Sequence, residues 1–424
     1  MVDYVNLNYE PNENDLIAMY YVEKAPECKD LEHASEEIAK ESSIGTWTDI
    51  STLSADIAKK LKPSVFHINP KNQIIQIAYT KDLFEADNMS QILSAIAGNI
   101  YGMKIINKLR LLDISFPRDI VNAYKGPIFG IDGIRKLIKI NDRPLLGTIV
   151  KPKVGLNENE HAKVCGDAWS GGLDIVKDDE NLTSMAFNQF EKRIEETLKE
   201  RNKIENETGD KKIYMPNITA KLSVMKQRAD FVVKHGGEYV MVDIVTVGFS
   251  ALQEIRDYLE DKNVVIHAHR AMHAAFTRDK THGMTMLALA KIMRLIGMDQ
   301  LHTGTIIGKM EGPKKEVVEM NEVITKERVN GNNISTLDQD WGDIKPILPV
   351  ASGGLSPLHV PDLIKILGKD IVLQFGGGCH GHPGGTIKGA KAIRQAVDAV
   401  LNETPLIEHA KYNLELKQAI EKWA

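Results

Sequence analysis

The sequence has little cysteine, no long apolar run and no excess of basic residues. Its three cysteines, Cys28, Cys165 and Cys379, are far apart and form no CxxC pair, so neither a disulfide framework nor a thiolate zinc site is expected and a reducing, cytoplasmic location is predicted. No apolar stretch approaches the ~20 residues that span a bilayer, and the first residues lack the basic start and apolar core of a signal peptide. The formal net charge of −5 argues against a nucleic-acid or membrane-surface partner.

What the chain does have is a repeating pattern of strands and helices. At 424 residues it is too long for one small core, so two domains or one large α/β barrel are expected. In its second part, short β-branched runs alternate with amphipathic stretches, which is typical of βαβ units around a parallel sheet. Eight such units favour a closed (β/α)8 TIM barrel over the alternative, a doubly wound open sheet. The predicted strands cover 145–152, 173–180, 214–220, 239–248, 264–271, 301–309, 347–354 and 371–378.

The chain is predicted to divide into a smaller α+β domain, residues 1–126, and a barrel domain with a short C-terminal helical segment, residues 127–424. A stretch with Gly and Pro, 124–145, is expected to link the two. In the first domain, 5–11 and 72–80 alternate like strands, whereas 30–43 and 90–102 have helical periodicity. The clearest barrel helices are predicted over 186–201, 223–237, 284–297 and 385–400.

Polar side chains end nearly every predicted barrel strand, where barrel enzymes carry their chemistry. Taken singly, a lysine there is a solvated charge, a histidine is a hydrogen-bonded core residue and a glycine pair is a tight turn. A whole ring of such groups does not serve stability, because like charges repel and buried charges must be desolvated, so we interpret the ring as a functional site. The ring comprises Lys151, Lys153, Lys177, Asp178, Asp179, Glu180, Asn217, His267, His269, Arg270, His273, His302, Lys309, Ser352, Gly353, Gly354, Gly376, Gly377 and Gly378.

The residue types in this ring predict a sugar bisphosphate bound beside a hard cation. Backbone N–H groups in the glycine turns after the seventh and eighth strands suit one phosphate. Arg270 and His302 are expected to form a second cationic site across the mouth. Asp179 and Glu180 offer the oxygen ligands that Mg²⁺ prefers. Because a metal beside a carbonyl acidifies the neighbouring C–H, enolisation is the expected first step.

Lys177 directly precedes three carboxylates, although an ammonium group cannot bind Mg²⁺. A solvated salt-bridge cluster is the plain explanation. The chemical alternative is that Lys151 and Lys153 lower the pKa of Lys177, so that its amine adds CO₂. The resulting carbamate would be a third oxygen ligand, and residue chemistry alone permits this without requiring it.

A series of motifs along almost the whole chain closely resembles the RuBisCO large-subunit family, and the archaeal form III enzymes most of all. The resemblance implies Mg²⁺-dependent carboxylation and oxygenation of ribulose 1,5-bisphosphate, by CO₂ and O₂, through a lysine carbamate and an enediolate. Two 3-phosphoglycerates would be the carboxylation product, in archaeal nucleotide-ribose (AMP) metabolism. The motifs are ESSIGTWT (41–48), AGNIYGMK (97–104), TIVKPKVGL (148–156), GGLDIVKDDENLTS (171–184), HAHRAMHA (267–274), HTGTIIGKMEG (302–312), ASGGL (351–355) and LQFGGGCHGHPGG (373–385).

The resemblance also implies roles for matching residues. Lys177, as its carbamate, would bind one Mg²⁺ with Asp179 and Glu180 and act as the base. Three further catalytic residues are implied, namely Lys151 for proton transfer, His269 for deprotonation and hydration, and Lys309 for positioning CO₂ on a loop that closes. The implied substrate-binding residues are Glu41, Thr46, Trp47, Asn99, Lys153, Arg270, His302, Ser352, Gly353, Gly354, Gln374, Gly376 and Gly377.

Four of these residues, Glu41, Thr46, Trp47 and Asn99, come from the first domain, and in the family they reach into the barrel mouth of a second subunit. A homodimer or a ring of homodimers, without a small subunit, is therefore implied. Two other functions remain as alternatives: a RuBisCO-like enolase or isomerase that fixes no CO₂, and a catalytically silent sugar-bisphosphate sensor. Cys379 departs from the common family motif, which raises the hypothesis that its oxidation perturbs activity.

Overall fold

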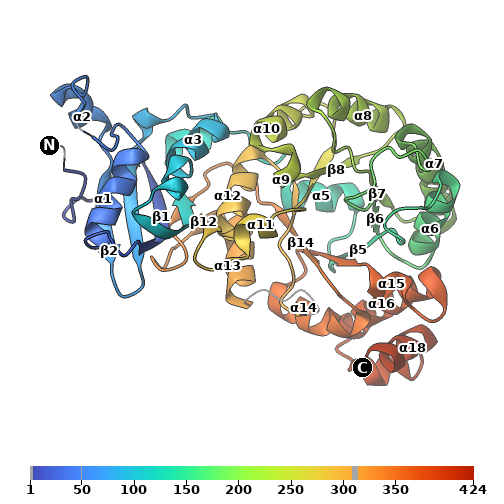
Figure 1. The fold of residues 1–424 in the computed structure, drawn as a ribbon. Coiled ribbons are helices and arrows are strands. Elements are labelled where there is room, and N and C mark those ends of the chain that lie inside the picture. The colour runs from blue at the N-terminus through green and yellow to red at the C-terminus, as the bar shows by residue number, and fades with distance from the viewer. Residues whose placement is uncertain (1–2, 49, 308–313) are drawn as a thin grey trace. The chain divides into compact units, whose positions relative to one another are not determined.

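The computed structural model describes residues 3–48, 50–307 and 314–424, which form two compact units (Figure 1). Unit 1 consists of Met1–Gly126, Met272–Gly297 and Lys326–Lys345, and unit 2 consists of Pro127–Ala271, Met298–Thr325 and Pro346–Ala424. The predicted fold class, a barrel preceded by a smaller α+β domain, is confirmed. The division of the chain into domains at residue 126 stays a prediction.

Eight parallel strands form the sheet of unit 2. They are β5 (Leu145–Ile149), β6 (Ile175–Lys177), β7 (Ile213–Met215), β8 (Tyr239–Asp243), β9 (Val265–His269), β11 (Gln300–His302), β14 (Leu348–Ser352) and β15 (Val372–Phe375). Their order is β7-β6-β5-β15-β14-β11-β9-β8. An isolated parallel bridge between Asn217 and Met241 joins the two ends of this order, next to β7 and β8. The bridge closes the sheet into a barrel. Each of the eight strands lies within a stretch predicted from the sequence or begins one residue before it.

Helices surround the barrel strands, as Figure 1 shows for α6, α7 and α8. The helices of unit 2 are α5 (Gly130–Ile138), α6 (Glu158–Ser170), α7 (Phe190–Thr208), α8 (Leu222–Lys234), α9 (Ile244–Val247), α10 (Phe249–Tyr258), α13 (Lys314–Thr325), η3 (Pro357–His359), α14 (Val360–Leu367), α15 (Gly377–His380), α16 (Gly385–Leu401), α17 (Leu406–Ala410) and α18 (Leu414–Trp423). In the described ranges no helix is both long and apolar enough to cross a membrane.

The stretch predicted as a linker, 124–145, is not a plain linker, because it contains helix α5. Ile134 and Ile138 on this helix belong to one buried cluster with Leu145 of β5, Tyr239 of β8 and the first residues of β6, β7, β9, β14 and β15. Helix α5 therefore packs at the N-terminal end of the barrel. Its two glycines have low helix propensity, which explains why the sequence did not predict it.

Unit 1 contains a five-stranded sheet in the order β10-β4-β1-β3-β2. The expected strand over residues 5–11 is wrong: Val5 forms an isolated bridge to Val65, and the Asn6 carbonyl accepts from the Tyr9 N–H in a turn. The strands of unit 1 are β1 (Asp15–Lys24), β2 (Ser64–Asn69), β3 (Ile74–Thr80), β4 (Ile106–Ser115), β10 (Gly283–Met284), β12 (Arg328–Val329) and β13 (Gln339–Asp340). Its helices are α1 (Leu31–Glu41), α2 (Ala55–Leu61), η1 (Lys81–Leu83), α3 (Met89–Ile96), η2 (Asn99–Gly102), α4 (Arg118–Ala123), α11 (Ala274–Thr277) and α12 (Met286–Ile296).

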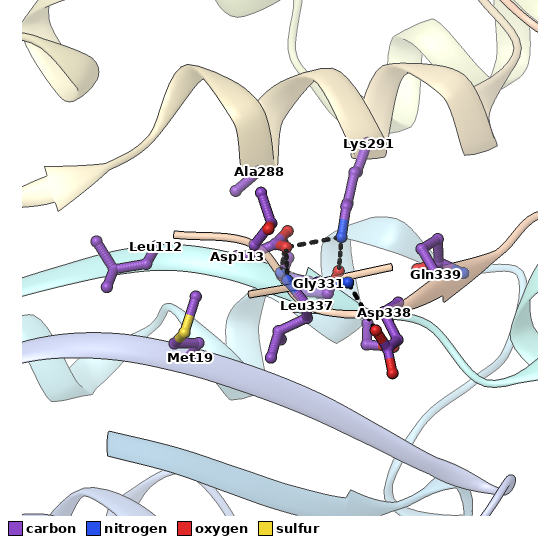
Figure 2. Close-up of polar contacts among 12 residues, drawn as sticks. Met19, Leu112, Asp113, Ala288, Lys291, Gly331, Leu337, Asp338 and Gln339 are labelled. Carbon is purple, nitrogen blue, oxygen red and sulfur yellow. Dashed lines mark hydrogen bonds and ion pairs between the residues drawn. The ribbon is translucent and has the colours of Figure 1, made fainter. Parts of the chain in front are cut away.

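Helix α12 follows the fifth barrel strand in sequence, where a barrel helix was expected, but it belongs to unit 1. Two contacts hold it there. Strand β10, just before the helix, pairs in parallel with β4, and Lys291 on the helix donates to Asp113 on β4 and to the Ile114 carbonyl (Figure 2). Asp113 also accepts from the Leu337 N–H, so three separate segments of unit 1 meet at this carboxylate.

Candidate active site

The C-terminal ends of the barrel strands carry much of the predicted polar ring. Lys177 is the last residue of β6, His269 of β9, His302 of β11 and Ser352 of β14. Gln374 on β15 is the register partner of Ser352. Because the strands are parallel, these residues meet at one end of the barrel, which is the end where barrel enzymes have their active sites.

The amine of Lys177 is fully buried. Its Nζ donates to the Asp178 carbonyl at 2.8 Å and lies 3.2 Å from Met241 Sδ. Burial lowers the pKa of Lys177, although the neighbouring carboxylates, Glu180 foremost, act to raise it. The pKa of Lys177 is therefore lowered as expected, but the expected cause, the neighbouring Lys151 and Lys153, is wrong, because burial is what lowers it. The environment favours the uncharged amine, which is the form that can attack CO₂.

Two other lysines pair with the carboxylates that follow Lys177. Lys151 Nζ lies 2.7 Å from Asp179 Oδ2, and Lys153 Nζ lies 3.8 Å from Glu180 Oε1. Burial acts to raise the pKa of Asp179, but the hydrogen bonds it accepts, that from Lys151 foremost, outweigh burial and lower it. Burial also acts to raise the pKa of Glu180, but the charges of Lys177 and His269 and a backbone hydrogen bond together outweigh it and lower this pKa. Both carboxylates are thus ionised at neutral pH.

The side chain of Asp178, between Lys177 and Asp179 in the sequence, contacts residues other than those that pair with its two neighbours. Its Oδ1 accepts from Tyr214 Oη at 2.6 Å, and its Oδ2 accepts from the Asn217 N–H at 3.0 Å and from Arg193 Nε at 3.1 Å. The Asp178 side chain is fully buried. Burial would raise its pKa, but the Arg193 charge and the hydrogen bonds lower it instead. Asp178 therefore anchors the segment that carries the Asp179 and Glu180 carboxylates, a role that the charge run alone did not indicate.

Histidines form a second part of the site. His269 Nδ1 lies 2.7 Å from Asp243 Oδ1, and its Nε2 lies 3.6 Å from Glu180 Oε2. Burial lowers the pKa of His269, and it lowers the pKa of His267 to about 3. A neutral His269 that donates from Nδ1 to Asp243 keeps Nε2 as a base on the side of Glu180. This geometry suits proton transfer.

Arg270 lies directly after β9 and against the glycine turn after β11. A Cβ at Gly304 would come 2.6 Å from Arg270 Nη2, and Gly304 has a φ of +91°. The positive φ favours glycine in the HTGT motif, and a Cβ there would displace the Arg270 guanidinium. Burial lowers the pKa of Arg270 to about 10, and its guanidinium still stays charged at neutral pH. This charge is close enough to His302 to act on the pKa of that imidazole. The charge of Arg270 can attract an anionic group.

The glycine turns after β14 and β15 complete the ring. Gly353 and Gly354 have φ values of +120° and +70°, which favour glycine. A Cβ at Gly376 would be 3.6 Å from Lys151 Cε, while no atom of the described residues lies within 4 Å of one at Gly377. Gln374 is buried, and its amide nitrogen and oxygen have no hydrogen-bond partner within the described ranges. An unpaired buried amide costs free energy, so Gln374 suits a polar ligand.

The two unusual residues after the glycines have structural contacts. His380 Nε2 lies 3.0 Å from both Thr148 Oγ1 and the Ile149 carbonyl oxygen, and its Nδ1 lies 3.0 Å from Thr386 Oγ1. The Cys379 side chain is fully buried, and burial raises the pKa of its thiol to about 12. The reactive thiolate is therefore suppressed, which argues against the hypothesis of a redox role.

The remaining predicted site residues lie elsewhere in the chain. In unit 1, Glu41 and Asn99 are brought together, with Asn99 Nδ2 3.4 Å from Glu41 Oε1. Trp47 in the same unit is 85% exposed, which is unusual for so large an apolar side chain. Thr46 lies next to it in a segment without regular structure. Lys309 lies outside the described residues.

The chain matches two family models that together cover nearly its whole length. Residues 3–120 match the ribulose bisphosphate carboxylase large chain, N-terminal domain, and residues 130–423 match the catalytic domain of the same chain. It is 53% identical, over 100% of both chains, to the ribulose bisphosphate carboxylase of Methanocaldococcus jannaschii.

Solved structures are similar as well. The octameric ribulose-1,5-bisphosphate carboxylase/oxygenase of Pyrococcus horikoshii is 46% identical, with a TM-score of 0.92 and coverage of 99% of this chain and 96% of that one. The dimeric archaeal Rubisco of Hyperthermus butylicus is 38% identical, with a TM-score of 0.93 and coverage of 99% and 98%. The resemblance to archaeal enzymes that the motifs indicated is confirmed.

Proposed function

The chain belongs to the ribulose bisphosphate carboxylase large-chain family and is an enzyme of that class, and we propose that it joins CO₂ to ribulose 1,5-bisphosphate. Two 3-phosphoglycerates are the product, and O₂ reacts at the same site in place of CO₂. The observation that carries this proposal is the buried Lys177 amine beside the ionised Asp179 and Glu180. Such an amine is suited to react with CO₂, and such carboxylates are suited to a divalent cation.

Activation is the first part of the proposal. The uncharged Lys177 nitrogen attacks the carbon of a CO₂ molecule, an N–C bond forms, and the nitrogen releases a proton to water. The carbamate so formed adds oxygen ligands to the carboxylates of Asp179 and Glu180. These three groups would hold one Mg²⁺, a hard cation that prefers oxygen. When bound, Mg²⁺ would polarise the substrate carbonyl and make the adjacent C–H more acidic.

Proton handling falls to groups of the barrel mouth. The Lys177 carbamate takes the substrate C3 proton to give the enediolate. His269, with a free Nε2 on the side of Glu180, assists deprotonation and hydration. Lys151, whose ammonium group pairs with Asp179, returns a proton to the product carbon, and Lys153 supports it.

Anion binding positions the substrate across the mouth. Arg270, beside His302, would bind one phosphate, and its guanidinium supplies the charge. The other phosphate and a sugar hydroxyl would be bound on the side of β14 and β15. Lys309 would close over the substrate and position CO₂. The residues assigned to that second side are Ser352, Gly353, Gly354, Gln374, Gly376 and Gly377.

A homodimer, or a ring of homodimers, is the proposed assembly. Among the relatives, the Hyperthermus butylicus protein is described as dimeric and that of Pyrococcus horikoshii as octameric. In this chain Glu41, Thr46, Trp47 and Asn99 would complete the mouth of the partner subunit, and the 85% exposure of Trp47 supports such a contact. Supply of the substrate from nucleotide ribose (AMP metabolism) and a cytoplasmic location are parts of the same proposal.

The test is anaerobic incubation of the protein with Mg²⁺, ribulose 1,5-bisphosphate and labelled bicarbonate. We expect acid-stable label in 3-phosphoglycerate, and none with Lys177→Ala. A ¹³C carbamate signal from ¹³CO₂ should appear in the wild type and be absent from Lys177→Ala. Exchange of the C3 proton without label would favour the enolase or isomerase, and bisphosphate binding without either signal would favour the sensor.

A further inference from the structure

A buried line of hydrogen-bonding groups runs from inside the barrel to Ser352. Gln300 and His267 are register partners on β11 and β9, and Gln300 Oε1 lies 2.8 Å from His267 Nδ1. His267 Nε2 lies 2.9 Å from His302 Nε2, and His302 Nδ1 lies 2.7 Å from Ser352 Oγ. Gln300 and His267 are fully buried and His302 is 3% exposed, so only the Ser352 end reaches the site.

Each contact in this line needs one hydrogen between its two heavy atoms. Burial keeps both imidazoles neutral at neutral pH, since it lowers the pKa of His267 to about 3 and that of His302 also falls well below its ordinary value. A neutral imidazole has one N–H and one lone pair. The direction of the first hydrogen bond therefore fixes the direction of all the others.

The Gln300 carbonyl oxygen is only an acceptor, so His267 must donate to it from Nδ1. His267 Nε2 then accepts from His302 Nε2–H, and His302 Nδ1 accepts from the Ser352 hydroxyl. With its hydrogen directed inward, Ser352 Oγ offers only lone pairs to the site. Both ring nitrogens of His302 are engaged in hydrogen bonds and the ring is neutral. Arg270 therefore supplies the positive charge that binds an anion.

We propose that His267 and Gln300 are positioning residues that hold His302 in its Nε2–H tautomer and make Ser352 a hydrogen-bond acceptor toward the substrate. The substrate group that Ser352 selects is then a donor, a sugar hydroxyl, and not a carbonyl or a phosphate oxygen. This inference rests on the proposed function, because the ligand it concerns is the sugar bisphosphate of that reaction. It assigns a role to two residues that touch no substrate.

The first test needs no substrate. In protein with ¹⁵N-labelled histidine, long-range ¹H–¹⁵N NMR distinguishes the two tautomers of each imidazole. We expect the Nδ1–H form for His267 and the Nε2–H form for His302. The opposite pair of tautomers, which a rotated Gln300 amide would produce, or a doubly protonated ring at neutral pH would overturn the proposal.

The second test uses two matched variants of His267. A Gln side chain reaches the former Nε2 position and keeps an acceptor for His302, whereas an Asn side chain reaches only the Nδ1 position. We expect His267→Gln to keep the substrate KM within about threefold of wild type, and His267→Asn to raise KM about tenfold, the usual cost of one such hydrogen bond. The kcat should change far less than KM in both.

Thermal unfolding of both variants controls for damage to the barrel core. Equal KM values for the two variants, whether raised or unchanged, would contradict the proposal. A wild-type protein that fixes no CO₂ would defeat the proposed function alone, because the tautomers are measured without substrate. Carboxylation with the opposite tautomers would defeat only this inference.

Discussion

Lys291 Nζ lies 2.8 Å from Asp113 Oδ2, and neither side chain has any exposed area. Such a pair is costly to break, because removal of one partner leaves the other charge buried without compensation. Here the pair also joins helix α12 to strand β4, and Asp113 accepts in addition from the Leu337 N–H at 2.7 Å.

We therefore expect Lys291→Met to lower the free energy of unfolding by about 3–5 kcal/mol. Denaturant unfolding followed by circular dichroism measures this change. Lys417→Met is the matched control, because its ion pair with Glu421 is more than half exposed on both sides and should contribute at most about 1 kcal/mol. Similar losses in the two variants would show that the buried pair stabilises unit 1 no more than an exposed ion pair does.

Asp178 is expected to support metal binding without being a ligand. Asp178→Asn weakens the contact with Arg193 and loosens the segment before Asp179, so the Mg²⁺ concentration for half-maximal activation should rise about 10–100-fold. Tyr214→Phe removes one of the hydrogen bonds to Asp178 and should have a smaller effect.

Mg²⁺ titration of carboxylation, with calorimetric titration of the metal, measures these changes. Asp210→Asn is the control, because that side chain is 71% exposed. An unchanged Mg²⁺ requirement in Asp178→Asn would mean that the segment keeps its position without the carboxylate.

Asp299 gives the barrel a dependence of stability on pH. Burial raises its pKa from 3.8 to about 6. The carboxylate accepts hydrogen bonds from the N–H groups of Phe129, Gly130 and Ile266, which act to lower the pKa but do not outweigh burial. A carboxyl whose pKa is higher in the folded state stabilises the fold below its unfolded pKa, and this contribution is lost as the pH rises through the folded pKa. The contribution of Asp299 to the free energy of unfolding should therefore fall by up to about 3 kcal/mol as the pH rises from 4 to 6.

Denaturant unfolding at several pH values between 4 and 7 tests this expectation. Asp299→Asn does not titrate, so the difference between wild type and variant isolates the carboxyl. Parallel pH profiles for the two proteins would refute the assignment.

Cys379 is expected to be chemically inert. With a buried thiol whose pKa is raised to about 12, alkylation by iodoacetamide at pH 8 should be far slower than for a free cysteine. Cys379→Ser should leave the sensitivity of the activity to peroxide unchanged. Mass spectrometry of the alkylated protein identifies the modified cysteine, and rapid modification at position 379 would restore the redox hypothesis.

Most of the barrel could be predicted because its strands are buried on both sides and bounded by helices. Such strands appear as short apolar runs, and several end in a polar residue at the mouth, as β6 does at Lys177. Unit 1 was harder. Strand β1 lies between two neighbours and is buried along most of both faces, so DLIAMYYVEK has no clear alternation of polar and apolar residues, and the strand was missed.

The site could be predicted only as far as residue types carry it. The charge run 177–180 indicated ligands and an amine, but not that Asp178 makes its contacts away from the other two carboxylates or that burial, and not neighbouring lysines, sets the pKa of Lys177. His267 was predicted as one of the polar residues of the ring, yet its contacts with Gln300 and His302 depend on the register of β9 and β11. Register across parallel strands is not visible in a single sequence.

The division of unit 1 among three segments affects how this unit folds while the chain is being synthesised. When residue 126 leaves the ribosome, β10, α12 and the segment up to Lys345 do not yet exist, and they follow only roughly 10–40 s later at ordinary translation rates. Throughout that interval β4 lacks β10 at its edge, and Asp113 has no Lys291 to neutralise it. The edge of β4 therefore stays without its strand partner β10 until most of the barrel has been translated, and during this time it must not pair with strands of other chains.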